Sequence, residues 1–301
     1  MRSQTTSHNE YGQITSIMLK KAKDAFISEE RISSEWKSLN FTEAPVLDTC
    51  IDQYNDFEKI IIDQIQPVIH YLPQDDSLTL DSLYCRDAAI VTDHGVILCN
   101  MGKANRKGEP SAIKSLCEKK GIKILGAIEE PGTIEGGDIA WIDYHTLAVA
   151  NAYRTNQSGI DQLRSFLKPF DIEIMEVHLP HYKGAGDVFH LMSIFSPIDR
   201  DIAVVYSSLM PVTFRNALLD RHYRLIEVPD TEFESMGCNV LAISPRNVMM
   251  VSGNPITAER IRHAGCTVHE YDGSEISIKG GGGPTCLTRP LMRTLFDTGF
   301  A

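Results

Sequence analysis

Hydrophobic stretches recur along the chain in a fixed order: two short strands joined by a polar turn, an amphipathic helix, and another strand. The first copy predicts strands over 88–92 and 95–101, a helix over 111–120 and a strand over 122–128. The same order returns within 138–179, 190–228 and 239–271. The turns lie roughly fifty residues apart, a period typical of repeats that bury their hydrophobic faces against one another.

A fifth copy can be assembled from the two ends of the chain. It combines a strand over 14–20 with a strand over 286–293, followed by a helix over 51–65 and a strand over 67–72. Closing a ring in this way pairs sheet edges that an open array would expose. The alternative is an ordinary open α/β sheet, but neither GxGxxG nor a P-loop occurs to support its commonest, nucleotide-binding version.

No composition shift or Pro/Ser-rich linker marks a domain boundary. The sequence therefore predicts one continuous domain over residues 1–301. Within it, residues 26–41 stand outside the repeats and are predicted to be an added N-terminal helical segment.

Composition narrows the range of partners. With 29 Lys and Arg against 40 Asp and Glu, the net charge is -11, which disfavours nucleic-acid and anionic membrane partners. No segment reaches the roughly 20 apolar residues of a membrane span, and the start lacks a secretory leader. Seven cysteines without CxxC spacing suggest free thiols. We therefore expect a cytoplasmic protein; the sequence leaves a homodimer open.

The sharpest local feature is a run of four glycines and a proline that leads to Cys286. Glycines allow the backbone to approach a ligand closely, so such a run can line a tight pocket beside a thiol. The same run could also be a flexible turn between strands. Since cysteine seldom follows such a turn without purpose, we predict that Cys286 is a nucleophile.

A nucleophilic thiol needs a proton carrier, and His178, His181 and His190 lie in one stretch. His190 is the best candidate because it is expected to head a strand after a glycine-containing loop. With Asp187, these histidines could instead suggest a metal site. That pattern lacks a third ligand at fixed spacing, so we predict neither a metal nor a cofactor.

Carboxylates and arginines accompany these two residues. Glu135 and Asp138 flank two glycines before a strand, and Asp81 and Asp87 precede another strand. Such residues can simply bond turn amides, but two carboxylates in one pocket also fit a planar guanidinium. Two arginines, each following a predicted strand, could be surface charges or could hold a substrate carboxylate: Arg106 and Arg154.

Five motifs occur together in the chain: YCRD, IEGGD, RTNQSG, HLMS and GGGGPTCLTRPL. In this order and spacing they resemble the guanidine-modifying enzymes of the pentein superfamily, over roughly residues 75 to 293. These enzymes include dimethylarginine dimethylaminohydrolases, arginine deiminases and amidinotransferases. The resemblance implies a pentein five-bladed α/β propeller of ββαβ repeats, in agreement with the repeats described above.

The resemblance also implies a cysteine hydrolase of arginine or a methylated arginine. Such an enzyme gives citrulline and an amine or ammonia through a covalent S-alkylthiouronium intermediate, without a cofactor. The roles implied are nucleophile for Cys286, general acid/base for His190, assisting carboxylate for Glu135, guanidinium binding for Asp81 and Asp87, and substrate-carboxylate binding for Arg106 and Arg154.

Two positions depart from the family patterns. Met192 stands where deiminases usually have an aspartate, and Gly281 stands where the dimethylarginine enzymes have one. The particular guanidino substrate therefore stays open. The alternatives are an amidinotransferase, which passes the amidino group to an amine, and a non-catalytic protein like the superfamily's ribosome-associating members.

Overall fold

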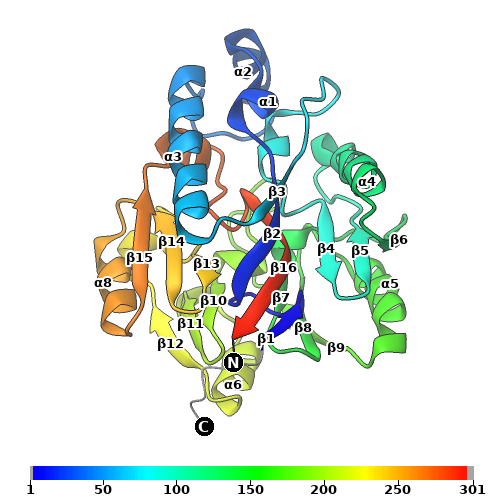
Figure 1. The fold of residues 1–301 in the computed structure, drawn as a ribbon, viewed down its shortest axis with the longest axis vertical. Helices are drawn as coiled ribbons and strands as arrows, with labels where there is room; N and C mark the ends of the chain where they lie inside the picture. The colour runs from blue at the N-terminus through cyan, green and yellow to red at the C-terminus, as the bar shows by residue number, and fades with distance from the viewer. Residues whose placement is uncertain (1–2, 297–301) are drawn as a thin grey trace.

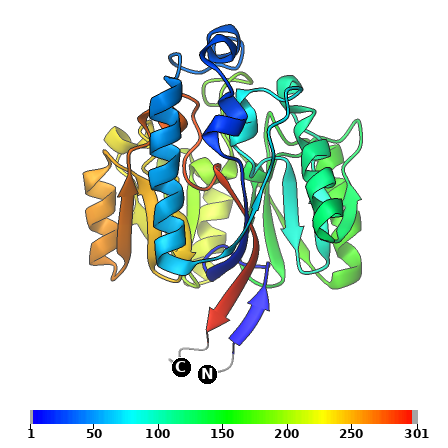
Figure 2. The same cartoon turned by 45° about the horizontal axis from the view of Figure 1, so that its top comes forward.

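The computed structural model describes residues 3–296 and contains five small sheets around a common centre. Four of the sheets have three strands and one has four. In Figures 1 and 2 the strands surround this centre, and the longer helices lie on the outside of the ring. This arrangement is the α/β propeller that the sequence predicts, and it differs from an open sheet.

Each three-stranded sheet has the same connectivity. Its first two strands pair antiparallel, and the second strand pairs parallel with the third after a helical crossover, as in β4, β5 and β6. The four units are β4 (Ala89–Thr92), β5 (Gly95–Leu98), α4 (Glu109–Lys120) and β6 (Ile124–Ala127); β7 (Ile139–Trp141), β8 (Thr146–Asn151), α5 (Gln157–Leu167) and β9 (Glu173–His178); β10 (Phe195–Asp199), β11 (Ile202–Val205), α6 (Val212–Asp220) and β12 (Arg224–Glu227), followed by α7 (Asp230–Phe233); and β13 (Leu241–Ser244), β14 (Asn247–Val251), α8 (Pro255–His263) and β15 (Thr267–Tyr271).

The fifth unit joins the two ends of the chain, as predicted. β16 (Thr288–Phe296) pairs antiparallel with β2 (Gln13–Leu19), which pairs parallel with β3 (Val68–Tyr71) after α3 (Leu47–Ile65). An additional strand, β1 (Ser3–Thr6), pairs with the other edge of β16.

Alternating side chains along the strands close the ring. Leu147 of β8 packs in one hydrophobic cluster with the first unit, whereas its neighbour Ala148 packs in another cluster with the third unit. β2 does the same, with Ile17 facing the fourth unit and Met18 facing the first. Both faces of these strands are buried, which explains their nearly continuous hydrophobic sequences. Each fully buried aliphatic side chain contributes about 1.5–3 kcal/mol of transfer free energy.

Two predicted strands begin later in the structure than in the sequence analysis. The strand expected from His190 begins at Phe195, because residues 191–193 form one helical turn. The hydroxyl of Ser193 accepts the backbone N–H of His190 at 3.1 Å and stabilises this turn. Likewise, β16 begins at Thr288, two residues after Cys286. Both chemically important residues therefore lie just before their strands.

The segment 26–41 contains α2 (Glu29–Glu35), which follows the short helix α1 (Ala22–Phe26). Its last part packs inward, since Leu39 and Phe41 are buried in the cluster that also contains Tyr84. This packing brings the segment close to the YCRD motif.

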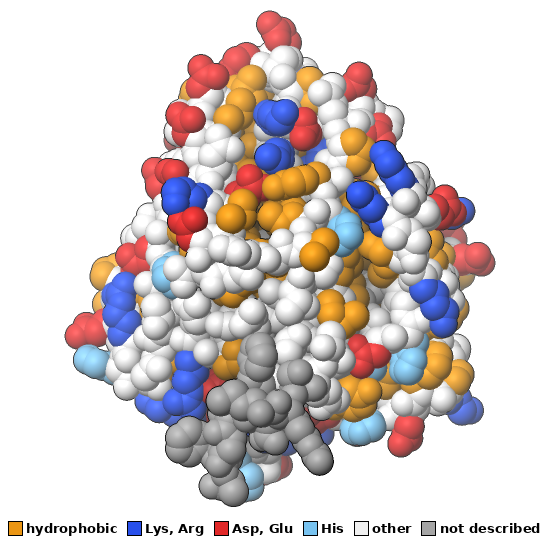
Figure 3. All heavy atoms as spheres, viewed as in Figure 1, with side chains coloured by type: hydrophobic (Ala, Val, Ile, Leu, Met, Phe, Trp, Pro, Cys, Tyr) orange, Lys and Arg blue, Asp and Glu red, His pale blue; other side chains and the backbone are white. Residues whose placement is uncertain are grey.

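None of the helices within residues 3–296 is long and apolar enough to cross a bilayer. On the face shown in Figure 3, basic side chains are interspersed with acidic ones and form no continuous basic patch.

Candidate active site

Two adjoining recesses lie at the motif residues. The larger, with a volume of about 360 Å³, is lined by Cys286 and His190 together with Asn239 and Met192. The smaller is lined by Asp81, Asp87, Arg106, Arg154 and Cys286. Val188, Gly280, Gly281 and Cys286 line both recesses. The structure thus brings six of the seven predicted site residues to one cavity wall; the seventh, Glu135, lies behind His190.

The repeat architecture explains this convergence. In each unit, a polar residue stands one to five positions before the first strand, and the first strands are the innermost ones. These residues are Asp87 before β4, Glu135 before β7, His190 before β10, Asn239 before β13 and Cys286 before β16. Since the units surround one centre, equivalent positions meet at one end of the ring.

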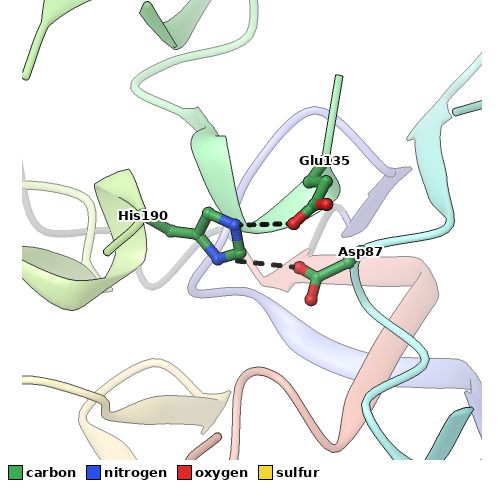
Figure 4. A group of neighbouring side chains, drawn as sticks. All are labelled: Asp87, Glu135 and His190. Atoms are coloured by element: carbon green, nitrogen blue, oxygen red, sulfur yellow. Dashed lines mark hydrogen bonds and ion pairs between the residues drawn. The ribbon is translucent and has the colours of Figure 1, made fainter. Parts of the chain in front are cut away.

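His190 lies between two carboxylates (Figure 4). Its Nε2 is 2.9 Å from Oε2 of Glu135, and its Nδ1 is 4.0 Å from Oδ1 of Asp87. The imidazole is 2% exposed and Glu135 is fully buried. Glu135 is fixed by two further donors, the backbone N–H of Lys103 at 2.9 Å and the guanidinium of Arg154 at 3.4 Å.

The surroundings favour the protonated form of His190. Burial alone would lower the pKa of His190, but the charges of Asp138 and Asp87 and the bonded Glu135 raise it to about 9. Burial would raise the pKa of Glu135, yet the hydrogen bond from His190, with Arg106 and Arg154, brings that pKa below its ordinary value. At neutral pH this pair is therefore an imidazolium and a carboxylate.

The two glycines of IEGGD are required by close packing. A Cβ on Gly137 would lie 2.4 Å from Nδ1 of His190, and one on Gly136 would lie 2.2 Å from the carbonyl oxygen of Arg86. Both distances are shorter than any side-chain carbon tolerates. The glycines therefore allow the Glu135 loop to lie directly against the histidine and the YCRD loop.

The glycine run before Cys286 also permits close approach. A Cβ on Gly282 would meet the ring of Tyr84 at 2.4 Å, and one on Gly283 would meet Asn239 at 2.5 Å. Gly281 has φ +75°, which favours glycine. The run is consequently a packed wall of the recess.

Cys286 is 6% exposed, and its thiol has two polar neighbours. The amide of Asn239 donates to Sγ at 3.5 Å, and the hydroxyl of Thr285 lies 3.9 Å from it. Burial raises the pKa of the Cys286 thiol, and the charge of Asp87 raises it further. Without a bound cation the sulfur is thus a thiol at neutral pH.

The acidic wall holds one free acceptor. Oδ2 of Asp87 accepts Nη1 of Arg106 at 2.5 Å, whereas its buried Oδ1 has no hydrogen-bond partner among residues 3–296. Asp81 is 2.6 Å from Nζ of Lys103, which also donates to the carbonyl oxygen of Leu39 at 2.8 Å. A planar cation in the recess would find its readiest acceptor at Asp87.

The two predicted arginines differ in their contacts. Arg106 donates from Nε and Nη2 to both oxygens of Glu109 at 2.8 Å, and also binds Asp87 and the carbonyl oxygen of Tyr84. Its guanidinium is thus engaged by protein groups. Arg154 is held only by long contacts, 3.4 Å to Glu135 and 3.3 Å to the carbonyl oxygen of Asp187. Arg154 therefore has donors available for a ligand at lower energetic cost.

Sequence reasoning missed Asn239 and Lys103 as members of the site and gave Asp138 no role. Asn239 could have been found from the repeats, since it occupies in the fourth unit the place of Asp87 in the first. Asp138 accepts the backbone N–H of Leu191 at 3.2 Å and so holds the turn after His190. Burial raises the pKa of Asp138 to about 6. No sequence signal marks Lys103, whose partner Leu39 belongs to a distant segment.

The group Asp87, Glu135 and His190 also has the spacing of a metal site, because one donor atom from each lies within 4.8 Å of the others. However, Nε2 of His190 is bonded to Glu135, and one oxygen of Asp87 is bonded to Arg106. Neighbouring guanidiniums would also repel a metal cation. The donor set fits a carboxylate-flanked imidazolium better than a metal centre.

We predict that Glu135→Gln lowers the pKa of His190 from about 9 by at least about one unit, because it removes a charge in direct contact. The ring resonances of His190, followed by NMR against pH, measure the change. Since the pKa of His190 is raised from 6.5 to about 9, its stabilising contribution is present below pH 6.5 and lost as the pH rises through 9. The variant should lose this dependence; Glu173→Gln, on the exposed side of β9, should keep it.

A second prediction concerns Asn239. Asn239→Asp keeps the oxygen that accepts the N–H of Thr285 but replaces the amide donor to Sγ with a negative charge. The pKa of the Cys286 thiol should rise by about one unit or more. Alkylation by iodoacetamide, located by peptide mass, should then require higher pH. Asn151→Asp, outside the cavity, is the control, and an unchanged pH profile for Asn239→Asp would contradict the assignment.

Comparison with known proteins agrees with this geometry. The family model described as N,N dimethylarginine dimethylhydrolase, eukaryotic, matches residues 25–293. The Bacillus subtilis protein YkgA, described as uncharacterized, is 29% identical over 289 residues, covering 96% of each chain. An arginine deiminase of Listeria welshimeri is 26% identical over 257 residues, covering 71% of this chain and 62% of the deiminase, so the chain spans less than two thirds of that relative.

Among solved structures, a mutant of the DDAH from Pseudomonas aeruginosa complexed with citrulline superimposes with a TM-score of 0.73. It is 23% identical and covers 92% of this chain and 98% of its own, a likeness that establishes the shared fold. Because the family model spans most of the chain, including every motif described above, the chain belongs to the N,N dimethylarginine dimethylhydrolase family of pentein guanidine-modifying proteins.

Proposed function

We propose that this protein is a cysteine hydrolase that cleaves a C–N bond in the guanidinium group of arginine or a methylated arginine. The products are citrulline and ammonia or an alkylamine. One observation carries the proposal: the thiol of Cys286 and the imidazolium of His190 line one cavity beside a buried carboxylate oxygen of Asp87 that lacks a donor. The names of the matching family and of the deiminase relative support the same reaction class.

Substrate binding starts from the acidic wall. A guanidinium N–H would satisfy the free Oδ1 of Asp87, and Asp81 would supply a second acceptor after exchanging its contact with Lys103. Arg154 would hold the substrate carboxylate, since its present contacts are long. Arg106 would join it by giving up part of its bonding to Glu109. Lys103, released from Asp81, adds a third cation at this end.

Binding of the cation would also activate the nucleophile. The pKa of the Cys286 thiol is raised by burial and by Asp87. A guanidinium placed between Asp87 and the sulfur offsets that negative charge and lowers the thiol pKa. The amide of Asn239 then stabilises the thiolate from the opposite side. The thiolate would form only when the substrate is present.

The reaction would proceed in two halves. The thiolate forms a bond to the guanidinium carbon, the C–N bond to the leaving group breaks, and His190 donates its proton to the departing amine. An S-alkylthiouronium group remains on Cys286. Neutral His190 then takes a proton from water as the oxygen bonds to the same carbon, and the C–S bond breaks to give the ureido product. Glu135 keeps the imidazole oriented throughout, because their 2.9 Å hydrogen bond fixes the ring.

The His190 side of the cavity bears on the leaving group. Met192 occupies the place where deiminases usually have an aspartate, and the side chains of Val188 and Phe189 line the same recess. An apolar wall suits a methylated amine better than ammonia. The methylated substrate is therefore the favoured form of the proposal.

We further propose that residues 1–301 act as one catalytic domain to which the segment 26–41 contributes. Asn40 lines the larger recess, and the carbonyl oxygen of Leu39 accepts from Lys103. The cysteines of the chain are all free thiols, which fits the reducing conditions of the cytoplasm.

Cys286→Ser should abolish turnover, with a loss of roughly 10³-fold or more, as expected when a covalent nucleophile is removed. The measurement is ureido product formed from arginine, monomethylarginine and asymmetric dimethylarginine. Cys266→Ser, which changes a cysteine in a different hydrophobic cluster, should retain activity. Full activity of Cys286→Ser on every guanidine tested would end the proposed mechanism.

Incubation with a single guanidino compound separates hydrolase from amidinotransferase. A hydrolase turns over repeatedly and releases citrulline, because water completes the second half-reaction. A transferase stops after one equivalent on Cys286 and resumes only when an amine acceptor is added. We expect repeated turnover, which is followed by citrulline per enzyme; a single equivalent would favour the transferase.

A further inference from the structure

A cluster of buried arginines lies in the centre of the ring, below the active-site loops. Arg86 is 1% exposed, Arg293 2% and Arg289 6%. They come from the YCRD loop and from β16, at positions that the proposed reaction does not use. Burying a guanidinium costs several kcal/mol unless its charge is compensated.

The cluster contains one carboxylate. Both oxygens of Glu10 lie 3.1 Å from Nη2 of Arg86, and Oε1 also accepts the backbone N–H of Trp141. Within residues 3–296, Arg289 donates to the carbonyl oxygens of Arg86 and Gly136, and Arg293 to those of Gly12 and Ala242. Neither has an ion-pair partner in that part of the chain. Two positive charges in the cluster are therefore uncompensated.

Two donors of the cluster are also unused. Nη2 of Arg293 and Nε of Arg86 are buried and have no hydrogen-bond partner among the described residues. Burial, with mutual repulsion from Arg86, lowers the pKa of Arg289 and of Arg293 to about 10. Both guanidiniums are thus still charged at neutral pH, so the electrostatic problem is not relieved by deprotonation.

A small cavity adjoins these donors. It has a volume of about 10 Å³ and is lined by Arg289 and Arg293 together with Ser7, Asn9 and Glu10. Such a volume holds one water-sized body. The hydroxyl of Ser7 and the amide of Asn9 are spent on backbone oxygens, so the unused Nη2 of Arg293 is the group available to a ligand.

We propose that this cavity binds a single halide ion, with chloride as the physiological ligand. A water molecule would fill the space and accept one hydrogen bond, but it would leave both positive charges uncompensated. A monatomic anion is only slightly larger than water and reduces the excess charge. Oxyanions such as sulfate and phosphate need more room than the cavity offers. The ion would stabilise the loops that carry Asp87 and Glu135, since Arg289 bonds to both loops from below.

Bromide provides the direct test because its anomalous scattering identifies it. Crystals of the full-length wild-type protein grown in sodium bromide should show one anomalous peak in the cavity, in contact with Nη2 of Arg293. A peak without anomalous signal would mean that a water molecule occupies the cavity, and the proposal would then be wrong.

Solution stability gives the second readout. At constant ionic strength, replacing gluconate with chloride should raise the melting temperature by about 2 °C for each tenfold increase above the dissociation constant. Arg293→Met should abolish this dependence, whereas Arg221→Met, an exposed arginine of the third unit, should retain it. If Arg293→Met does not fold, the wild-type titration and the bromide peak decide the question. A bromide peak without any chloride-dependent stability would indicate an adventitious ion only and would overturn the proposal.

Discussion

The site depends on the contact between the His190 imidazolium and the Glu135 carboxylate in a space that excludes water. An ion pair buried this deeply is stable only if each charge has several partners. Glu135 has them in Lys103, Arg154 and the imidazole. His190 has Glu135 on one nitrogen, while Asp87 faces the other at 4.0 Å. The geometry of the acid/base is consequently fixed before any substrate arrives, and only the Asp87 side is left incompletely satisfied.

The ring explains how residues so distant in sequence form this contact. Each repeat delivers the residue just before its innermost strand to the same end of the molecule, and the hydrophobic packing between units fixes the angle between neighbours. His190 needs one additional device, the helical turn after it, because a residue inside a strand would point toward a neighbouring sheet. Ser193 and Asp138 supply the hydrogen bonds that hold this turn.

Periodicity and motif order predict much of this arrangement. The alternating strands, the amphipathic helices and the closure by the two chain ends follow from local patterns, and all five units occur where the sequence places them. The pairing of Lys103 with Asp81 could not be predicted, because it depends on how the segment before residue 41 packs against the first unit. Nor does the sequence reveal that Arg106 is already bound to Glu109, since spacing alone does not distinguish an available guanidinium from an occupied one.

The protein stacks charges of opposite sign in two layers. Asp87, Glu135 and Asp138 form an acidic layer that receives a cation, and the arginine layer lies directly below it. Arg289 links the two, because it donates to the carbonyl oxygens of Arg86 and Gly136, each next to a residue of the acidic wall or its glycine pair. A negative wall that must bind a guanidinium cannot carry its own cations on the same side, because they would repel the substrate. Cations placed beneath the backbone can hold the loops in position while the recess stays negative. That separation accounts for a buried arginine three residues after the nucleophile, on a strand whose other side chains are mostly apolar.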